Sequence, residues 1–236
     1  MQPELTPYRV AIYYAPDTQS DVWRLGSGWL GRNAATGQKL PLPAVDGIAK
    51  EVLTELTSHP RRYGWHATLK APFQLAPGHS LSTLRTGVQQ FCQGRQPFDL
   101  AAWDLSTTEG FLSLRPKHSP PELAQLAADC VQQLHCFAAP LSEAALARRR
   151  LAPLSPEEDA LLLAWGYPHV LEHFQFHFSL TGSLNLLPED QLPLLMLAAK
   201  THFHQVPAER VDRLSIFIEP RQGDDFQLLE QIRFTP

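Results

Sequence analysis

The stretch Arg62-Tyr63-Gly64-Trp65-His66-Ala67-Thr68-Leu69-Lys70-Ala71 alternates between polar or small residues and apolar ones. A period of two is that of a β-strand, in which successive side chains point to opposite faces of the sheet. The pattern predicts a strand over about 62–72 whose apolar row lies in a core. His66, Thr68 and Lys70 then share the opposite face of that strand.

A second stretch, His173-Phe174-Gln175-Phe176-His177-Phe178-Ser179-Leu180-Thr181, shows the same alternation. Its even positions are phenylalanine or leucine, and its odd positions are polar. The pattern predicts a strand over about 173–182 that presents His177 and Ser179 on the face opposite its apolar row.

The segments after the two strands are also alike, since each strand is succeeded by one helical pattern and two strand-like patterns. These lie at about 81–93, 97–105 and 109–115 after the first strand, and at about 189–204, 211–219 and 226–234 after the second. The repeated order predicts a degenerate internal duplication, with accidental recurrence as the alternative. We therefore expect an α+β fold in a single two-lobed domain over 1–236. Its two strand-helix-hairpin lobes are expected to be related by a pseudo-twofold axis, with antiparallel sheets lining a central cleft and helices outside.

The remaining segments connect or extend these lobes. A strand is predicted over 9–15 and a helix over 44–58, whereas the glycine-rich segment 19–43 is expected to be a long ordered loop. A largely helical insert is expected over about 119–167. It contains Arg148-Arg149-Arg150, a run that indicates either a solvated helix end or a binding patch.

The composition is that of a globular protein without a broadly basic surface. The chain has 236 residues, 44% of them hydrophobic, and its 20 basic and 24 acidic residues give a formal net charge of −4. Extensive electrostatic binding to nucleic acid is therefore not expected. No apolar run approaches the roughly 20 residues that span a bilayer, and Met1–Pro7 lacks the pattern of a secretory signal. Three sparse cysteines form no disulfide framework, so we expect a cytoplasmic protein.

Each predicted strand carries a histidine followed two residues later by a hydroxyl residue. Two side chains at this spacing on a strand lie on one face, about 6.5–7 Å apart. If the two strands lie side by side, two imidazoles and two hydroxyls converge on one cleft. One neutral imidazole could then take a proton from water and the other could protonate a leaving oxygen, while the hydroxyls hold a phosphodiester.

These paired motifs resemble the two-histidine phosphoesterase superfamily, which includes RNA 2′,3′-cyclic phosphodiesterases. Four strings are similar to a bacterial branch associated with phosphonate-utilisation operons, and they lie at 13–16, 29–32, 62–73 and 174–182. The resemblance implies metal-independent catalysis without a cofactor, with His66 and His177 as the acid and base and Thr68 and Ser179 as phosphate ligands. Ser179 departs from the usual threonine but keeps the hydroxyl.

Five further residues are weaker candidates for contact with substrate. Lys70 shares the predicted face of His66 and Thr68, with a solvated rim lysine as the alternative. The others are Tyr14 in the first predicted strand, Trp29 and Arg32 in the predicted long loop, and Thr181 on the polar face of the second motif strand. For each of them a structural role is the alternative.

Three functions stay open from the sequence. The first is hydrolysis of a small cyclic phosphodiester, with a phosphoribosyl cyclic phosphate of phosphonate metabolism as one candidate. The second is an RNA 2′,3′-cyclic phosphodiesterase or 2′,5′-end ligase, and the third is a protein that binds a phosphorylated metabolite without catalysis. The expected partner is a small phosphorylated substrate or an RNA terminus, with no membrane and no metal. Serine hydrolase, P-loop and dinucleotide-binding motifs are absent from the sequence.

Overall fold

The computed structural model describes residues 5–108 and 110–236. Residues 1–4 of the N-terminal stretch and position 109, where one predicted strand begins, lie outside the described residues. The strands, in chain order, are β1 Arg9–Tyr14, β2 Ala67–Phe73, β3 Phe98–Asp99, β4 Trp103–Ser106, β5 Phe111–Pro116, β6 Phe178–Ser183, β7 Arg210–Val211, β8 Arg213–Glu219 and β9 Gln227–Arg233. The α-helices are α1 Asp21–Leu30, α2 Lys50–Leu56, α3 Ser58–Tyr63, α4 Leu81–Cys92, α5 Pro121–Gln133, α6 Glu143–Arg149, α7 Pro156–Trp165 and α8 Leu192–His202.

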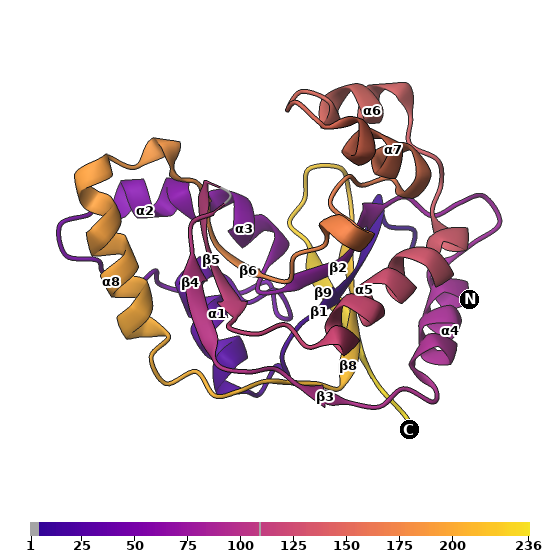
Figure 1. Cartoon of the computed structure of the whole chain (residues 1–236), viewed down its shortest axis with the longest axis horizontal. Helices are drawn as coiled ribbons and strands as arrows, with labels where there is room; N and C mark the ends of the chain where they lie inside the picture. The colour runs from indigo at the N-terminus through magenta and orange to yellow at the C-terminus, as the bar shows by residue number, and fades with distance from the viewer. Residues whose placement is uncertain (1–4, 109) are drawn as a thin grey trace.

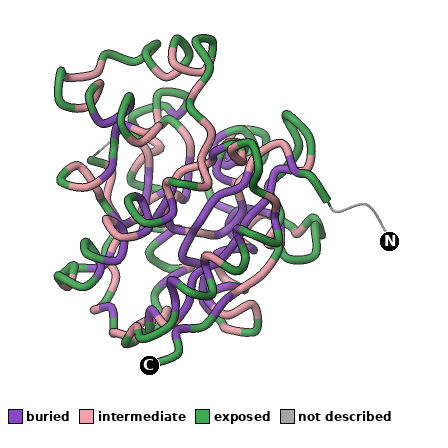
Figure 2. The backbone as a smooth tube through the Cα atoms, turned by 90° about the vertical axis from the view of Figure 1, so that its right-hand side faces the viewer, coloured by how far each residue is buried: buried purple, intermediate pink, exposed green. Residues whose placement is uncertain are grey.

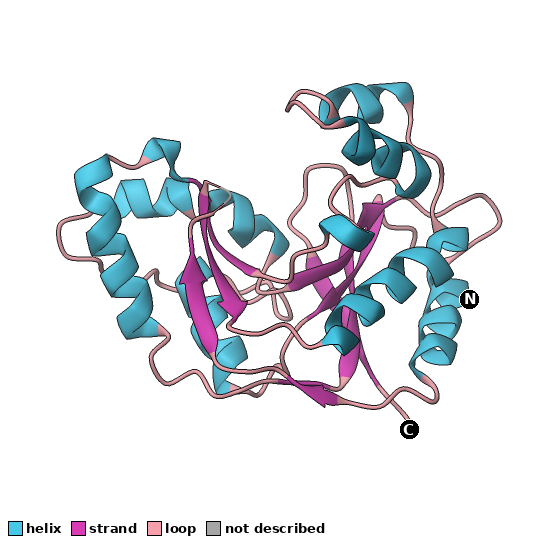
Figure 3. Cartoon of the chain, in the orientation of Figure 1, coloured by secondary structure: helices cyan, strands magenta, loops and turns pink. Residues whose placement is uncertain are grey.

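An antiparallel sheet forms the centre of the molecule, and helices flank it (Figures 1 and 3). In the described part of the chain its strand order is β4-β5-β6-β2-β1-β8-β9, and a two-stranded ribbon pairs β3 with β7. This confirms the predicted α+β fold. The sequence led us to expect separate sheets, whereas β2 and β6 join the two halves into one sheet through the pair Ala67 and Phe178.

The two halves of the sheet exchange their hairpins. The β4-β5 hairpin follows β2 in the sequence, yet β5 pairs with β6. The β8-β9 hairpin follows β6, yet β8 pairs with β1, which belongs to the half of the sheet that contains β2. The helices keep this arrangement, because α4 packs against β8 and β9 and α8 packs against β4 (Figure 1). The repeated element order is therefore present, but each hairpin joins the half of the sheet opposite to that of the motif strand before it.

Aromatic side chains fill the core beneath the junction of the halves. Trp65 is fully buried, and its ring stacks on Phe178 at a centroid distance of 4.6 Å and on Phe203 at 5.6 Å. The buried backbone runs through the centre of the molecule and the exposed backbone surrounds it (Figure 2). Burial of such large rings dominates the hydrophobic stabilisation of a core. It also fixes the backbone next to His66.

The expectation of a loop throughout 19–43 is wrong, because α1 occupies Asp21–Leu30. Gly26 allows close packing and Gly31 ends the helix. A Cβ atom at Gly26 would lie 1.9 Å from Cδ2 of Trp65, so only glycine lets the helix approach that ring. Gly31 ends the helix in the left-handed region with φ 75°, which glycine adopts without strain.

Both predicted motif strands begin later than their alternation indicates. The residues before β2 form α3 and a turn at Gly64, where φ is 80°. The alternation in this stretch arises because irregular backbone also inserts Trp65 into the core. In the second stretch, residues 174–177 precede β6 in the same way. His66 and His177 thus occupy equivalent positions, each one residue before its strand.

Other expected elements are present with adjusted bounds. The predicted helix over 44–58 begins later, as α2 at Lys50, and residues 44–49 are not helical; α3 follows after Thr57 and extends beyond the predicted range. The insert is helical as predicted, with α5, α6 and α7 inside it. Among the described residues, none of the helices has the length and apolar character needed to cross a lipid bilayer.

Candidate active site

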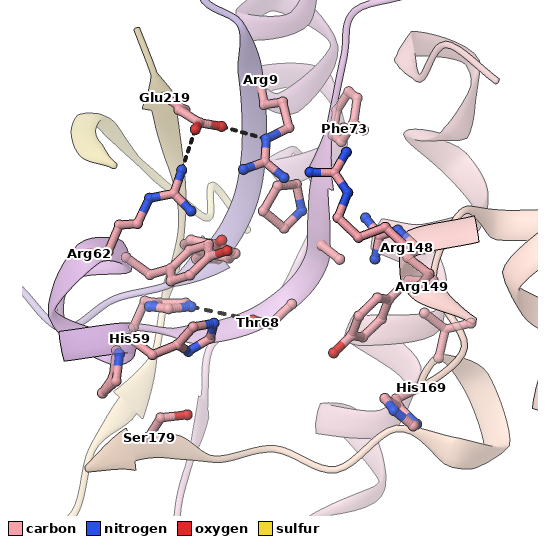
Figure 4. A pocket seen from close by; sticks show the side chains of 18 of the residues that line it. Arg9, His59, Arg62, Thr68, Phe73, Arg148, Arg149, His169, Ser179 and Glu219 are labelled. Carbon is pink, nitrogen blue, oxygen red and sulfur yellow. Dashed lines mark hydrogen bonds and ion pairs between the residues drawn. The ribbon is translucent and has the colours of Figure 1, made fainter. Parts of the chain in front are cut away.

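A cleft of about 1620 Å³ opens at the junction of the two halves of the sheet. Both histidine-hydroxyl pairs line it: His66, Thr68, His177 and Ser179. Figure 4 shows Thr68 on its curved strand, Ser179 below it, and arginine side chains entering from three elements. The structure therefore brings together the four residues that the two motifs singled out, although the two motifs are more than 100 positions apart in the sequence.

The register between the two motif strands explains this convergence. Ala67 and Phe178 pair in an antiparallel arrangement, and both side chains are fully buried on one face. The neighbours of such a pair point to the other face. In an antiparallel pair, the position before Ala67 is opposite the position after Phe178, and the reverse. His66 is therefore opposite Ser179, and Thr68 is opposite His177. Each histidine is therefore expected to face the hydroxyl of the other motif across the strands.

The backbone holds both imidazoles in the same way. Nδ1 of His66 lies 2.8 Å from the carbonyl oxygen of Gly64, and Nδ1 of His177 lies 2.9 Å from that of Gln175. A carbonyl oxygen only accepts hydrogen bonds, so each Nδ1 is the donor. In the neutral ring, Nε2 is then the acceptor. The Oγ1 atom of Thr68 lies 3.4 Å from Nε2 of His66.

His66 has an environment that keeps its ring neutral. Its ring stacks on Tyr13, with centroids 3.8 Å apart and planes inclined by 26°. Burial lowers the pKa of His66 to about 4, opposed by the hydrogen bond to Gly64 and assisted by repulsion from His177 and His59. The residue nevertheless keeps an exposed edge in the cleft. A neutral imidazole with an accessible nitrogen has the properties of a general base.

The structure does not place Lys70 in this cleft. Lys70 is 3% exposed, and its Nζ donates to the carbonyl of Val131 at 3.2 Å. The pairing with β1 explains the change of face, because Tyr13 is opposite Thr68 whereas Ile12 is opposite Lys70. Two residues of β2 therefore advance against one of β1, and such a bulge interrupts the alternation.

Three other candidates support the fold and do not line the described cleft. The hydroxyl of Tyr14 donates to Glu209 at 2.6 Å, and Nε1 of Trp29 donates to the carbonyl of Leu180 at 2.9 Å. Arg32 is 4% exposed and donates to the carbonyl of Phe226 at 2.6 Å. None of the three side chains is among the described residues that line the cleft.

Thr181 lines the cleft, but its hydroxyl is engaged by the backbone. Oγ1 accepts from the amide of Leu112 at 2.9 Å and donates to the carbonyl of Gly182 at 2.8 Å. The contact lies where the β5-β6 register shifts between Phe111 and Ser113. Thr181 thus satisfies an amide that the irregular ladder leaves without a strand partner.

Several residues that line the cleft were not predicted from the sequence. Tyr13 is the neighbour of the candidate Tyr14, and the alternation of β1 places the two on opposite faces. Arg9 and Arg62 reach the cleft from β1 and α3, and both form ion pairs with Glu219 (Figure 4). Arg148 and Arg149 also line the cleft, and the arginine run of the insert was the sequence signal for them.

No group of three or more histidine, cysteine, aspartate or glutamate side chains in the described residues is arranged to hold a metal ion. Metal-independent catalysis stays a prediction, which assays in the presence of a chelator can test.

Two curated proteins are similar to almost the whole chain. Both are called ribose 1,5-bisphosphate phosphokinase PhnN. The protein from Janthinobacterium sp. (strain Marseille) is 35% identical over 230 residues, which cover 96% of this chain and 51% of that protein. The protein from Laribacter hongkongensis (strain HLHK9) is 36% identical over 224 residues, which cover 93% of this chain and 50% of that protein. The chain therefore spans about half the length of these relatives.

Solved structures with low sequence identity are also similar to the chain. Escherichia coli LigT in complex with 3′-AMP is 12% identical with a TM-score of 0.45, and the match covers 98% of this chain and 99% of LigT. A structure described as a phosphoesterase is 12% identical with a TM-score of 0.43 and the same coverage. A family model described as a protein of unknown function, DUF1045, matches residues 68–227. The chain belongs to the DUF1045 family.

Proposed function

We propose that the chain is a metal-independent phosphoesterase of the two-histidine class that hydrolyses a small cyclic phosphodiester. The observation that carries this proposal is the equivalence of the two motifs. Each histidine lies one residue before its strand, donates from Nδ1 to the carbonyl two residues earlier, and lines one cleft together with both hydroxyls. Two imidazoles presented in this way suit the paired acid and base of a phosphodiester hydrolysis.

In the proposed reaction, His66 is the general base and His177 the general acid. The lowered pKa of His66, caused first by burial, favours its neutral form at neutral pH. Its Nε2 takes a proton from water as the water oxygen attacks phosphorus. The bond from phosphorus to one ring oxygen of the diester breaks, and protonated His177 gives its proton to that oxygen. Thr68 and Ser179 donate hydrogen bonds to the non-bridging oxygens, on which negative charge is held in the transition state.

The names of the curated relatives support one substrate in particular. They are called kinases of ribose 1,5-bisphosphate, and this chain matches only half of each. Hydrolysis of the bond between phosphorus and O2 in a 5-phosphoribosyl 1,2-cyclic phosphate leaves the phosphate on O1. The product is ribose 1,5-bisphosphate, the compound that those kinases consume. The chain has no P-loop motif of its own, so we infer that it acts in the step before phosphorylation.

The test is a panel of cyclic phosphodiesters that includes 5-phosphoribosyl 1,2-cyclic phosphate and 2′,3′-cyclic RNA termini. Each substrate is assayed with and without EDTA, using the unmodified protein, His66→Ala and His177→Ala. We expect turnover that survives EDTA and falls at least about a hundredfold in each variant, which is the usual contribution of a general acid or base. His204→Ala is the matched control, because His204 is exposed and lies outside the residues that line the cleft.

Unchanged turnover in either motif variant would overturn the assigned roles. Loss of turnover in EDTA that is restored by a divalent metal would overturn the metal-independent mechanism. Binding of every phosphorylated compound without any turnover would favour the non-catalytic alternative.

A further inference from the structure

We propose that four arginines of the cleft form a second anion site, which binds a phosphate monoester carried by the same small substrate. Their side chains come from three separate elements: Arg9 from β1, Arg62 from α3, and Arg148 and Arg149 from α6. The inference rests on the proposed function and narrows its substrate class. It also gives the helical insert a role in binding substrate, because Arg148 and Arg149 belong to the insert.

A buried carboxylate orients the first pair of arginines. Glu219 is fully buried, and it accepts from Nε of Arg9 and from a terminal nitrogen of Arg62 (Figure 4). The amide of Gly223 donates to the same carboxylate at 2.8 Å. The single negative charge of this carboxylate offsets one of the two guanidinium charges, so the group keeps a net positive charge. Each guanidinium has five N–H donors, and Glu219 uses only some of them.

Aromatic rings connect this pair to the catalytic end of the cleft. Cζ of Arg62 lies 5.5 Å from the ring centroid of Tyr63, and the Tyr63 ring lies 6.1 Å from that of His66. Tyr63 also stacks on Phe226 at 4.9 Å, and Cζ of Arg9 lies 5.5 Å from the centroid of that ring. The Tyr63 ring therefore lies between the proposed base and Arg62, and Phe226 continues the contact to Arg9. The two anion sites are close enough for one small molecule to reach both.

The second pair lies on α6, which stands above the sheet (Figure 1). Cζ of Arg149 lies 5.5 Å from the ring centroid of Tyr167, which also lines the cleft. Within residues 5–108 and 110–236, neither Arg148 nor Arg149 has a carboxylate within 4.0 Å. The third arginine of the run differs, because Arg150 pairs with Asp159 at 2.6 Å.

The two pairs face each other across the cleft. Burial lowers the pKa of Arg149, and repulsion from Arg9 and from Arg148 lowers it further. Figure 4 shows the α6 arginines extending toward Arg9 from the opposite side. An anion between the pairs would replace this repulsion with attraction, which is the electrostatic condition for a phosphate site.

Two further glutamates line the cleft without neutralising this cluster. Glu158 accepts from the amide of Ser155 at 2.8 Å and lies 3.5 Å from His169, so it caps α7 and is engaged there. Glu172 is exposed, in a short turn after the insert. Among the carboxylates of the described cleft, only Glu219 contacts the arginines.

The chemistry of four guanidinium groups identifies the ligand class. Arginine binds phosphate through two parallel N–H bonds, and a phosphate monoester offers up to two charges and three terminal oxygens. A cyclic diester has only one charge, which the histidine-hydroxyl pairs can hold. We therefore infer that the substrate carries a cyclic diester at one end and a phosphate monoester at the other, as a 5-phosphorylated sugar does.

Calorimetric titration with ribose 5-phosphate tests the site without requiring turnover. We expect the Arg148→Ala/Arg149→Ala double variant to bind at least about tenfold more weakly than the unmodified protein, because it loses charge-assisted hydrogen bonds to the phosphate. Arg150→Ala is the matched control, since Arg150 has its own carboxylate partner, and it is expected to bind normally. Ribose without phosphate should not bind. Equal affinity in the double variant, or no binding to the unmodified protein, would overturn the proposal.

A kinetic comparison separates this proposal from the proposed function. Ribosyl 1,2-cyclic phosphate is assayed with and without its 5-phosphate. We expect the phosphorylated substrate to have a lower KM in the unmodified protein, and the double variant to lose that advantage while it retains turnover of the unphosphorylated substrate. Equal KM values for both substrates would overturn the second site and leave the phosphoesterase intact. No turnover of either substrate, together with arginine-dependent binding, would overturn the phosphoesterase and leave the anion site.

Discussion

The ring of Tyr13 stacks on the imidazole of His66 at a centroid distance of 3.8 Å, with 26° between the planes. Tyr13 is 1% exposed, and its other neighbour is Phe217 at 5.1 Å. One face of the proposed base is therefore covered by an aromatic ring and shielded from water. This contact contributes to the burial that lowers the pKa of His66 to about 4.

We expect Tyr13→Leu to lower kcat/KM by roughly tenfold and to raise the pKa that governs the acid limb of the rate profile, because a smaller side chain admits water to His66. Tyr13→Phe keeps the ring and should behave like the unmodified protein. The measurement is kcat/KM across pH, with the folded fraction checked by circular dichroism. If the phenylalanine variant shifts the profile as much as the leucine variant, the hydroxyl rather than the stack is responsible.

The pH profile itself provides a second prediction. A base whose pKa is lowered is deprotonated over a wider range, so His66 is ready to accept a proton at any pH well above about 4. The acid limb of kcat/KM should therefore lie near pH 4, about 2.5 pH units below that of an unperturbed histidine. The rate should fall again at higher pH as the general acid loses its proton. An acid limb between pH 6 and 7 would contradict the assignment of His66 as the base.

Two glycines of α1 give a matched pair of stability predictions. Gly26→Ala would place a Cβ atom 1.9 Å from the buried ring of Trp65, whereas a Cβ atom at Gly28 meets nothing within 4 Å. We expect Gly26→Ala to lower the free energy of unfolding by about 3 kcal/mol or more, at the upper end of overpacking effects. Gly28→Ala should raise it by up to about 1 kcal/mol through helix propensity. Urea unfolding measures both changes, and a neutral Gly26→Ala would show that Trp65 can move.

The position of Lys70 leads to a prediction that opposes the sequence-based expectation. Its amine is bonded to Val131 beneath the sheet and is absent from the described lining of the cleft. Lys70→Met should therefore leave KM and kcat within about twofold, since methionine fills the same space. A rise in KM of tenfold or more would show that the amine does reach the substrate.

The same variant should change the dependence of stability on pH. Burial lowers the pKa of Lys70 from 10.5 to about 8. Between these values the unfolded chain binds the proton more readily, so the unmodified protein loses stability as pH falls from 10.5 to 8. The difference in unfolding free energy between the unmodified protein and Lys70→Met should therefore shift in favour of the variant from pH 10.5 to pH 8. Parallel pH curves for the two proteins would contradict this.

Alternation of residue types predicted much of the geometry that positions the site. It assigned Ala67 and Phe178 to the buried face and the neighbouring hydroxyls to the opposite face, and the structure has them there. It extended both strands too far toward the N-terminus, because residues in irregular backbone also insert large rings into the core. A period of two shows which side chains are buried, but it does not show whether the backbone forms the hydrogen bonds of a sheet.

Other features depended on contacts that are remote in the sequence. The bulge that turns Lys70 away is a property of the pairing with β1, which lies more than 50 residues earlier. The glycines of α1 indicated a loop, because the sequence does not show that the ring of Trp65 lies against Gly26. The arginine run was visible from the start, but only the tertiary structure separates the two that line the cleft from Arg150, which pairs with Asp159.

The exchange of hairpins between the halves of the sheet has a consequence for how such a protein can be divided. A fragment that ends after β5 would hold the first histidine but not β8, the partner of β1. The complementary fragment would hold the second histidine but not β5, the partner of β6. Neither piece contains a complete set of strands around its own motif. Cutting the chain between β5 and β6 would therefore leave both pieces with unpaired strand edges beside their motifs.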